Sequence, residues 1–121
     1  MKSITFNKEE KNLLLQNLNL DLKYINECIV EQEKIDSKNV TKRWKDKWQL
    51  PIVSSITKLT ECVETFSKRE TLKMLGCINY YQNADFDTTE LRLKLGDQKL
   101  LANKRRIEGY VKYYSNYACT P

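Results

Sequence analysis

Two stretches of the chain combine cationic and aromatic side chains in a spacing that suits binding. The first covers residues 42–48 and reads Lys-Arg-Trp-Lys-Asp-Lys-Trp. Together with Val40, its two tryptophans fall at i, i+4 and i+8, so a helix would present them as one stripe flanked by cations. Tryptophan and arginine are common anchors of protein interfaces, so we predict a partner-binding face here. Its members are Lys42, Arg43, Trp44, Lys45, Lys47 and Trp48.

The second stretch lies near the C-terminus, where cations and tyrosines gather on one side of an expected helix. At 100° per residue they share an arc of about 60°, beside an apolar stripe that contains Ile107 and Val111. Tyrosine offers a large rigid contact area with a polar tip, which suits recognition. The predicted second face consists of Lys99, Arg106, Tyr110, Tyr113 and Tyr117.

Both faces have a purely structural alternative. The two tryptophans could lie in the core while the lysines solvate the outer surface, because tryptophan is usually mostly buried. A tyrosine row beside an apolar stripe is also found at the border of many helical bundles. If neither face binds a partner, the next candidate is the acidic side of the first helix, around Glu27, Glu31 and Glu33.

The composition argues against the common catalytic and metal chemistries. The chain has no histidine, which removes the usual general base near neutral pH and the histidine-dependent metal sites. Its three glycines form no phosphate-binding loop. The four cysteines are far apart and contain no CxxC pair, so we expect free thiols that act as small apolar core residues. We therefore expect no enzyme, no cofactor and no metal.

The charge distribution favours partners with a negative surface. The net charge of +5 rises along the chain, from −1 in residues 1–35 to +2 in 36–66 and +4 in 67–121. No apolar run is long enough for a membrane span, and residues 1–7 lack the apolar core of a signal peptide, so we expect a cytoplasmic protein without membrane contact. Abundant Asn, Lys and Ile suggest an AT-rich coding sequence, as in low-GC bacteria, their phages or mobile elements.

Helices must position these faces, because apolar residues recur every three or four positions. Leu15, Leu18, Leu22, Ile25 and Ile29 form one stripe in a first helix expected from Asn7 to about residue 34, roughly 40 Å long. Asn7 and Glu10 have the spacing of a capping box, as do Ser67 and Glu70. The other expected helices cover residues 38–48, 51–67, 68–81, 87–95 and 97–117.

The stretch 91–95 leaves two interpretations open. Leu91, Leu93 and Leu95 alternate with cations, which also suits a half-buried strand. We favour a helix because Asp87 and Glu90 form a start signal, with Asp87 as the cap and Phe86 packing on Leu91.

The sequence therefore predicts an all-α, compact bundle of five to six helices in a single domain, residues 1–121, with a long N-terminal helix. Its expected core is Leu15, Leu18, Leu22, Ile25, Ile29, Ile56, Leu59, Val63, Phe66, Leu75, Ile107 and Val111, with Leu72 and Ile78 also inward. The expected function is non-enzymatic protein binding, as a stoichiometric inhibitor or adaptor. It would dock on a protein or protein–nucleic-acid complex with an acidic surface. The alternative is a DNA- or RNA-binding protein that uses the same faces, and a homodimer is compatible with both.

Overall fold

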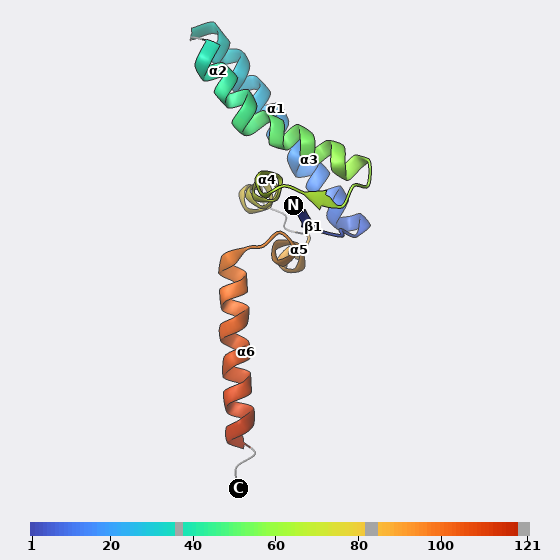
Figure 1. The fold of residues 1–121 in the computed structure, drawn as a ribbon, viewed down its shortest axis with the longest axis vertical. Coiled ribbons are helices and arrows are strands. Elements are labelled where there is room, and N and C mark those ends of the chain that lie inside the picture. Colours follow the sequence, from blue (N-terminus) through green and yellow to red (C-terminus); the bar gives the residue numbers. More distant parts are fainter. Residues whose placement is uncertain (36–37, 82–84, 119–121) are drawn as a thin grey trace.

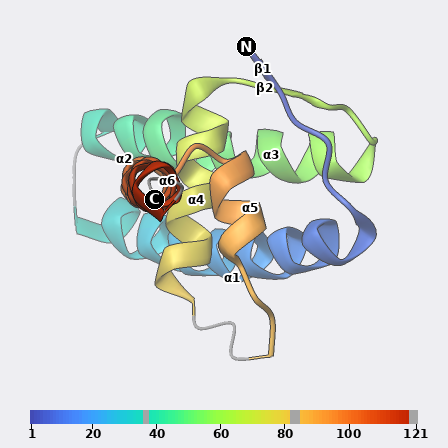
Figure 2. The ribbon, with the colours of Figure 1, turned by 90° about the horizontal axis from the view of Figure 1, so that it is seen from below.

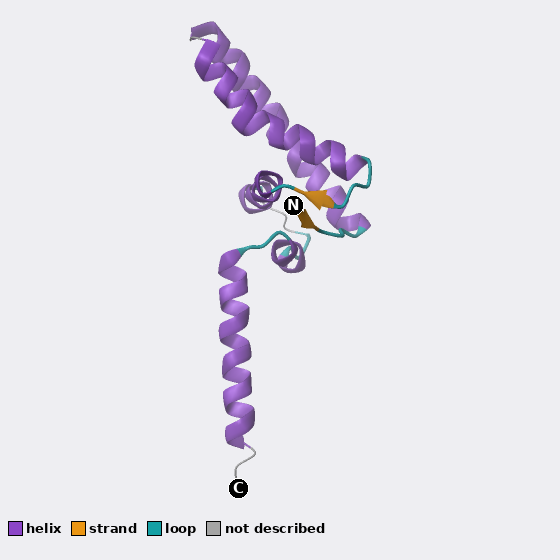
Figure 3. Ribbon diagram, viewed as in Figure 1, coloured by secondary structure: helices purple, strands orange, loops and turns teal. Residues whose placement is uncertain are grey.

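The computed structural model describes residues 1–35, 38–81 and 85–118, and the side chains of all of these except 38, 110 and 113–118. This part of the chain is almost entirely helical (Figure 3), which confirms the all-α class and the long N-terminal helix. The elements in chain order are β1 Lys2–Ser3, α1 Lys8–Ile35, α2 Lys38–Trp44, the π-helix η1 Lys45–Gln49, α3 Leu50–Thr60, β2 Thr65–Phe66, α4 Lys68–Tyr80, α5 Thr89–Lys94 and α6 Gln98–Ala118.

Two long helical rods form the base of the fold. The helices α2, η1 and α3 follow one another without a break and run back along α1 in the opposite direction (Figures 1 and 2). Helix α4 crosses this pair and contacts both α1 and α3. Helix α5 lies beside α4 in Figure 2, and α6 then projects away from the rest of the molecule (Figure 1).

Both predicted capping boxes are present. Asn7 Oδ1 accepts the Glu10 N–H at 2.8 Å, and Glu10 Oε1 accepts the Asn7 N–H at 2.9 Å. Ser67 and Glu70 make the same reciprocal pair at the start of α4. Each box satisfies amide hydrogens that a helix start otherwise leaves unpaired, so both helices begin where the sequence indicates.

The predicted helix 51–67 ends earlier than expected, at Thr60. Cys62 adopts a left-handed conformation with φ 59°, and the Val63 N–H returns to the Lys58 carbonyl at 2.9 Å. Residues 65–66 then pair antiparallel with residues 2–3, with Lys2 opposite Phe66. This short ribbon is a contact between distant parts of the sequence, which the helical pattern of residues 51–67 could not reveal.

The core lies where α1, α3 and α4 meet, and it extends under the ribbon and α5. Leu18, Ile25, Ile29, Leu59, Phe66 and Ile78 are buried as predicted. The predicted core residues Leu15, Leu22, Ile56 and Leu75 are partly buried and pack against it. Phe6 joins the core by an edge-to-face contact with Phe66, with ring centroids 5.7 Å apart.

Four predicted core positions are wrong. Val63 is exposed because α3 has already ended, and Leu72 points outward from α4. Ile107 and Val111 are 59% and 60% exposed, because α6 projects away from the other helices (Figure 1). A regular apolar stripe shows that a helix has an apolar face, but it does not show that the same chain covers that face.

Residues 91–94 are helical and Leu95 is the C-cap of α5, with Leu91 and Leu95 buried. Its cap differs in detail from the prediction: Thr88 is the N-cap, while Asp87 Oδ1 accepts hydrogen bonds from the backbone and hydroxyl of Thr89. Gly96 follows with φ 81°, a conformation that glycine adopts without strain. Asp97 Oδ1 then accepts hydrogen bonds from the backbone N–H groups of Lys99 and Leu100. These bonds cap the start of α6.

Candidate functional site

The two tryptophans of the segment 42–48 have different environments. Their rings stack, with centroids 6.3 Å apart and an interplanar angle of 22°. Trp44 packs against the core, whereas Trp48 remains 45% exposed. Trp44 therefore has the core contacts that the structural alternative expects, and Trp48 is accessible from solvent.

The π-helical segment η1 contains one of the two tryptophans. Its hydrogen bond from the Leu50 N–H to the Lys45 carbonyl spans five residues, so the turn is wider than in an α-helix. Trp48 lies within this wider turn, whereas Trp44 is the last residue of α2. Such π-helical turns are frequent at functional sites.

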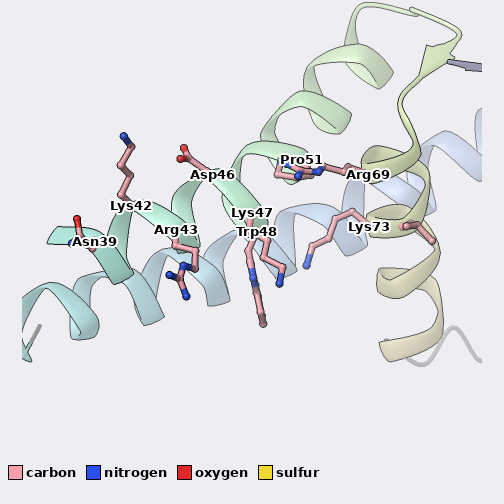
Figure 4. A pocket seen from close by; sticks show the side chains of 10 residues that line it. Asn39, Lys42, Arg43, Asp46, Lys47, Trp48, Pro51, Arg69 and Lys73 are labelled. Carbon is pink, nitrogen blue, oxygen red and sulfur yellow. The ribbon is translucent and has the colours of Figure 1, made fainter. Parts of the chain in front are cut away.

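An open groove of about 770 Å³ lies between the rod formed by α2, η1 and α3 and the helix α4 (Figure 4). Trp48 and Pro51 line it from the rod, and Leu72 lines it from α4. The remaining lining residues are Asn39, Lys42, Arg43, Asp46, Lys47, Arg69 and Lys73. In Figure 4 the side chains of Arg43, Lys47 and Trp48 extend on one side of the rod, while Lys42 and Asp46 point the other way.

The groove is strongly cationic. Five lysines and arginines line it against the single carboxylate of Asp46. Lys73 pairs with Asp21 at 2.9 Å, and its ammonium group lies 5.8 Å from the centre of the Trp48 ring. Within the described part of the chain, Lys42, Arg43, Lys47 and Arg69 form no salt bridge. Because Lys42 points to the other side of the rod in Figure 4, three cationic groups, those of Arg43, Lys47 and Arg69, are available to an incoming negative charge.

The structure brings together only part of the first predicted face. Lys42, Arg43, Lys47 and Trp48 line the groove. Lys45 instead pairs with Glu33 of α1 at 3.2 Å, and Trp44 packs inward. The sequence did not predict Arg69 and Lys73 as part of this site. They lie on α4, more than twenty positions after Trp48 in the chain. Their i, i+4 spacing is unremarkable for a surface helix and gave no signal.

The described part of the second predicted face is separate from the groove. Lys99 and Arg106 are exposed on α6, which points away from the cationic groove. The side chains of Tyr110, Tyr113 and Tyr117 lie outside the described part of the structure. The described members of the second face, Lys99 and Arg106, therefore do not line the cationic groove.

The cysteines differ in accessibility. Cys77 is buried, and its thiol donates to Asp21 Oδ2 at 3.4 Å. Burial and the neighbouring Asp21 carboxylate raise the pKa of Cys77 to about 12, so this thiol is a poor nucleophile at neutral pH. Cys62 is exposed, contrary to the expectation of a core residue, and Cys119 lies outside the described residues.

The most perturbed carboxylate has a structural role. Glu70 is buried at the start of α4, where Lys58 Nζ donates to it at 2.7 Å and the Ser54 hydroxyl and Ser67 N–H also donate. Burial alone raises the pKa of Glu70, but these hydrogen bonds outweigh it and lower the pKa to about 2. Among the described side chains, no three cysteines or carboxylates are close enough to share a metal ion.

The arrangement of the cationic groove is suited to binding anionic groups.

No protein-family model, no curated protein and no solved structure matches the chain. Within the described ranges, none of the helices combines the length and the apolar character that a membrane span needs. The function therefore has to be inferred from the geometry of the groove itself.

Proposed function

We propose that this chain is a non-enzymatic binding protein that docks through its cationic groove on an acidic surface of another protein. In that role it would act as a stoichiometric inhibitor or adaptor. The supporting observation is that Arg43, Lys47 and Arg69, which form no salt bridge with any described residue, share a groove with the half-exposed ring of Trp48. An acidic partner would supply the counter-charges that the described part of the chain does not provide.

The apolar residues of the groove favour a protein partner. Trp48 and Leu72 are 45% and 57% exposed and lie among the cations that line the groove. Tryptophan and arginine anchors surrounded by polar groups are typical of the strongest contacts in protein interfaces. The apolar contacts would supply affinity, while the cations would select an acidic surface and speed association.

The alternative is DNA or RNA binding by the same groove. An exposed aromatic ring beside cations can stack on a base of a single strand while the cations contact phosphates. Salt separates the two hypotheses. For nucleic acid, log K falls steeply with log salt concentration, by about 0.9 for each duplex phosphate contacted and about 0.7 for a single strand. Affinity for a protein partner that depends mainly on buried Trp48 and Leu72 should fall far less.

The decisive variant is Arg43→Glu with Lys47→Glu. We expect this variant to weaken binding to the partner by at least about 30-fold, because the loss of one strong interface anchor has an effect of that size. The melting temperature should stay nearly constant, because both positions are on the surface. The matched control is Lys8→Glu with Lys23→Glu, which makes the same charge change at exposed positions of α1 outside the groove.

The measurement begins with affinity capture and mass spectrometry, followed by titration of the purified partner with wild type, groove variant and control. Fluorescence anisotropy with single-stranded and duplex oligonucleotides runs in parallel at several salt concentrations. Salt-sensitive oligonucleotide binding that the groove variant abolishes, without any captured protein, would support the alternative. Equal partner affinity for the groove variant and wild type would show that the groove is not the binding site.

A further inference from the structure

Helix α6 carries an apolar stripe that nothing in the described structure covers. Leu100, Ile107 and Val111 lie within an arc of about 40° on a regular helix. Leu100 is half-buried near α5, but Ile107 and Val111 are more than half exposed. Exposed apolar residues that are aligned on one helix face, rather than scattered, mark an interaction surface.

A second groove, lined by different residues from the cationic one, lies between α1 and α2. It measures about 300 Å³ and has Trp44 at its α2 side. All its other lining residues come from one face of α1, at spacings of one, three or four. They are Tyr24, Glu27, Cys28, Glu31, Gln32 and Ile35. We call this the acidic groove, because its only charged lining residues in the described part of the chain are Glu27 and Glu31.

The two surfaces match in length and in chemistry. Tyr24 to Ile35 and Leu100 to Val111 each span eleven positions, or about 16 Å of helix. The groove presents Tyr24, Cys28 and Ile35 along that length, with Ile35 79% exposed, and Glu27 and Glu31 between them. The stripe of α6 can therefore lie along the α1 face with its apolar residues against these three side chains and its cations beside the two carboxylates.

Charge complementarity favours the pairing of α6 with the acidic groove over the pairing of α6 with another α6. Helix α6 contains five cations, Lys99, Lys104, Arg105, Arg106 and Lys112, but only one acid, Glu108. Two α6 helices packed together would place like charges side by side, which is destabilising. The acidic groove instead offers carboxylates to a cationic helix. Glu31 already pairs with Lys34, but that pair is exposed and contributes little, so Glu31 can exchange partners.

The helix cannot reach the acidic groove of its own chain. Figure 1 shows α2 and the adjoining end of α1 at the top of the molecule, while α6 runs from α5 toward the bottom. We propose that α6 of one copy docks in the acidic groove of a second copy, and that the exchange is reciprocal. Two such contacts related by a twofold axis form a closed dimer. This inference is independent of the function proposed for the cationic groove.

The first test removes the apolar stripe. Sedimentation velocity of the full chain, over a wide concentration range, should show a dimer for wild type and a monomer for Ile107→Asp with Val111→Asp. The matched control is Ala102→Asp with Gly109→Asp, which adds the same charge at exposed positions on the opposite side of α6. A side chain at Gly109 meets no other atom within 4 Å, so the control should remain dimeric.

The second test exchanges charges between the two surfaces. Glu27→Lys with Glu31→Lys makes the groove cationic, and Lys104→Glu with Arg105→Glu and Arg106→Glu changes the net charge of α6 from +4 to −2. Each variant alone should be monomeric or at least tenfold weaker as a dimer, because like charges meet in both contacts. An equimolar mixture should restore the dimer, since both contacts of the mixed pair join opposite charges.

Three results would overturn the proposal. The first is a wild-type chain that stays monomeric at every concentration. The second is a dimer that Ile107→Asp with Val111→Asp dissolves but that survives Glu27→Lys with Glu31→Lys unchanged, since α6 would then pair elsewhere. The third is a mixture of the two charge variants that does not associate. Circular dichroism of each variant confirms that loss of the dimer is not loss of the fold.

Discussion

Helices α1 and α6 are the two longest elements of this protein, and the sequence predicts an apolar stripe on each. The stripe of α1 packs under α3 and α4, with Leu18, Ile25 and Ile29 buried and Leu15 and Leu22 partly buried. The stripe of α6 leaves Ile107 and Val111 exposed. Identical periodicity thus leads to a core in one region and to an open surface in the other.

The difference comes from the connections rather than from the helices. After α1 the chain returns along it, so α3 and α4 cover its apolar face. Before α6, the left-handed Gly96 and the cap at Asp97 turn the chain away from α1, α3 and α4. Periodicity identifies a face that avoids water, and the connections determine whether the same chain or another one covers it.

The largest expected difference between the two regions is in how much their apolar residues contribute to the free energy of unfolding. Leu18→Ala should lower the free energy of unfolding by about 2–5 kcal/mol, because it leaves a cavity in a fully buried site. Ile107→Ala should change it by less than about 0.5 kcal/mol. Urea unfolding followed by circular dichroism, at concentrations low enough for a monomer, measures both. Equal losses would mean that α6 packs against its own chain.

The next prediction concerns Glu70, which joins α4 to α3 through Lys58 and Ser54. Its folded-state pKa of about 2 lies below the ordinary value of 4.5, so the carboxylate stabilises the fold above pH 4.5. That stabilisation, on the order of 3 kcal/mol, is lost as the pH falls from about 4.5 to 2.

Glu70→Gln should therefore be much less stable at neutral pH and should lose less stability on acidification. Urea unfolding at a series of pH values measures this, with Glu90→Gln on the exposed side of α5 as the control. If wild type and Glu70→Gln show the same acid dependence, other groups govern acid unfolding.

The smallest expected effect compares the caps of α4 and α6. Ser67→Ala removes a cap inside the packed region and should lower the global stability by about 1 kcal/mol. Asp97→Ala removes a cap of similar strength, but α6 is held mainly at its start, so only its first turns should fray. Hydrogen exchange of backbone amides distinguishes the two results. Faster exchange in α1 after Asp97→Ala would show that the two regions unfold together.

Local features of this fold could be predicted from the sequence. The two capping boxes, Pro51 in the first turn of α3 and the start of α1 depend on residues within four positions of one another. The ribbon that joins residues 2–3 to 65–66 could not be predicted, because its two halves are about sixty positions apart and only two residues long.

The candidate site shows the same division. Lys42, Arg43, Lys47 and Trp48 are close in sequence, so their helical spacing was enough to group them. Arg69, Leu72 and Lys73 complete the groove only because α4 crosses the rod at η1. The π-helical turn that contains Trp48 is not part of the α-helical periodicity used in the prediction.

The sequence by itself thus determined the helical class, the helix starts and the faces that carry apolar or cationic residues, because these follow from side-chain spacing and short-range hydrogen bonds. Only the tertiary structure decided which faces meet. It buried the stripe of α1 and left that of α6 open, and it placed cations of α4 beside Trp48. The physical reason is that packing depends on the direction in which each connection sends the next helix, and that direction is set by contacts between distant residues.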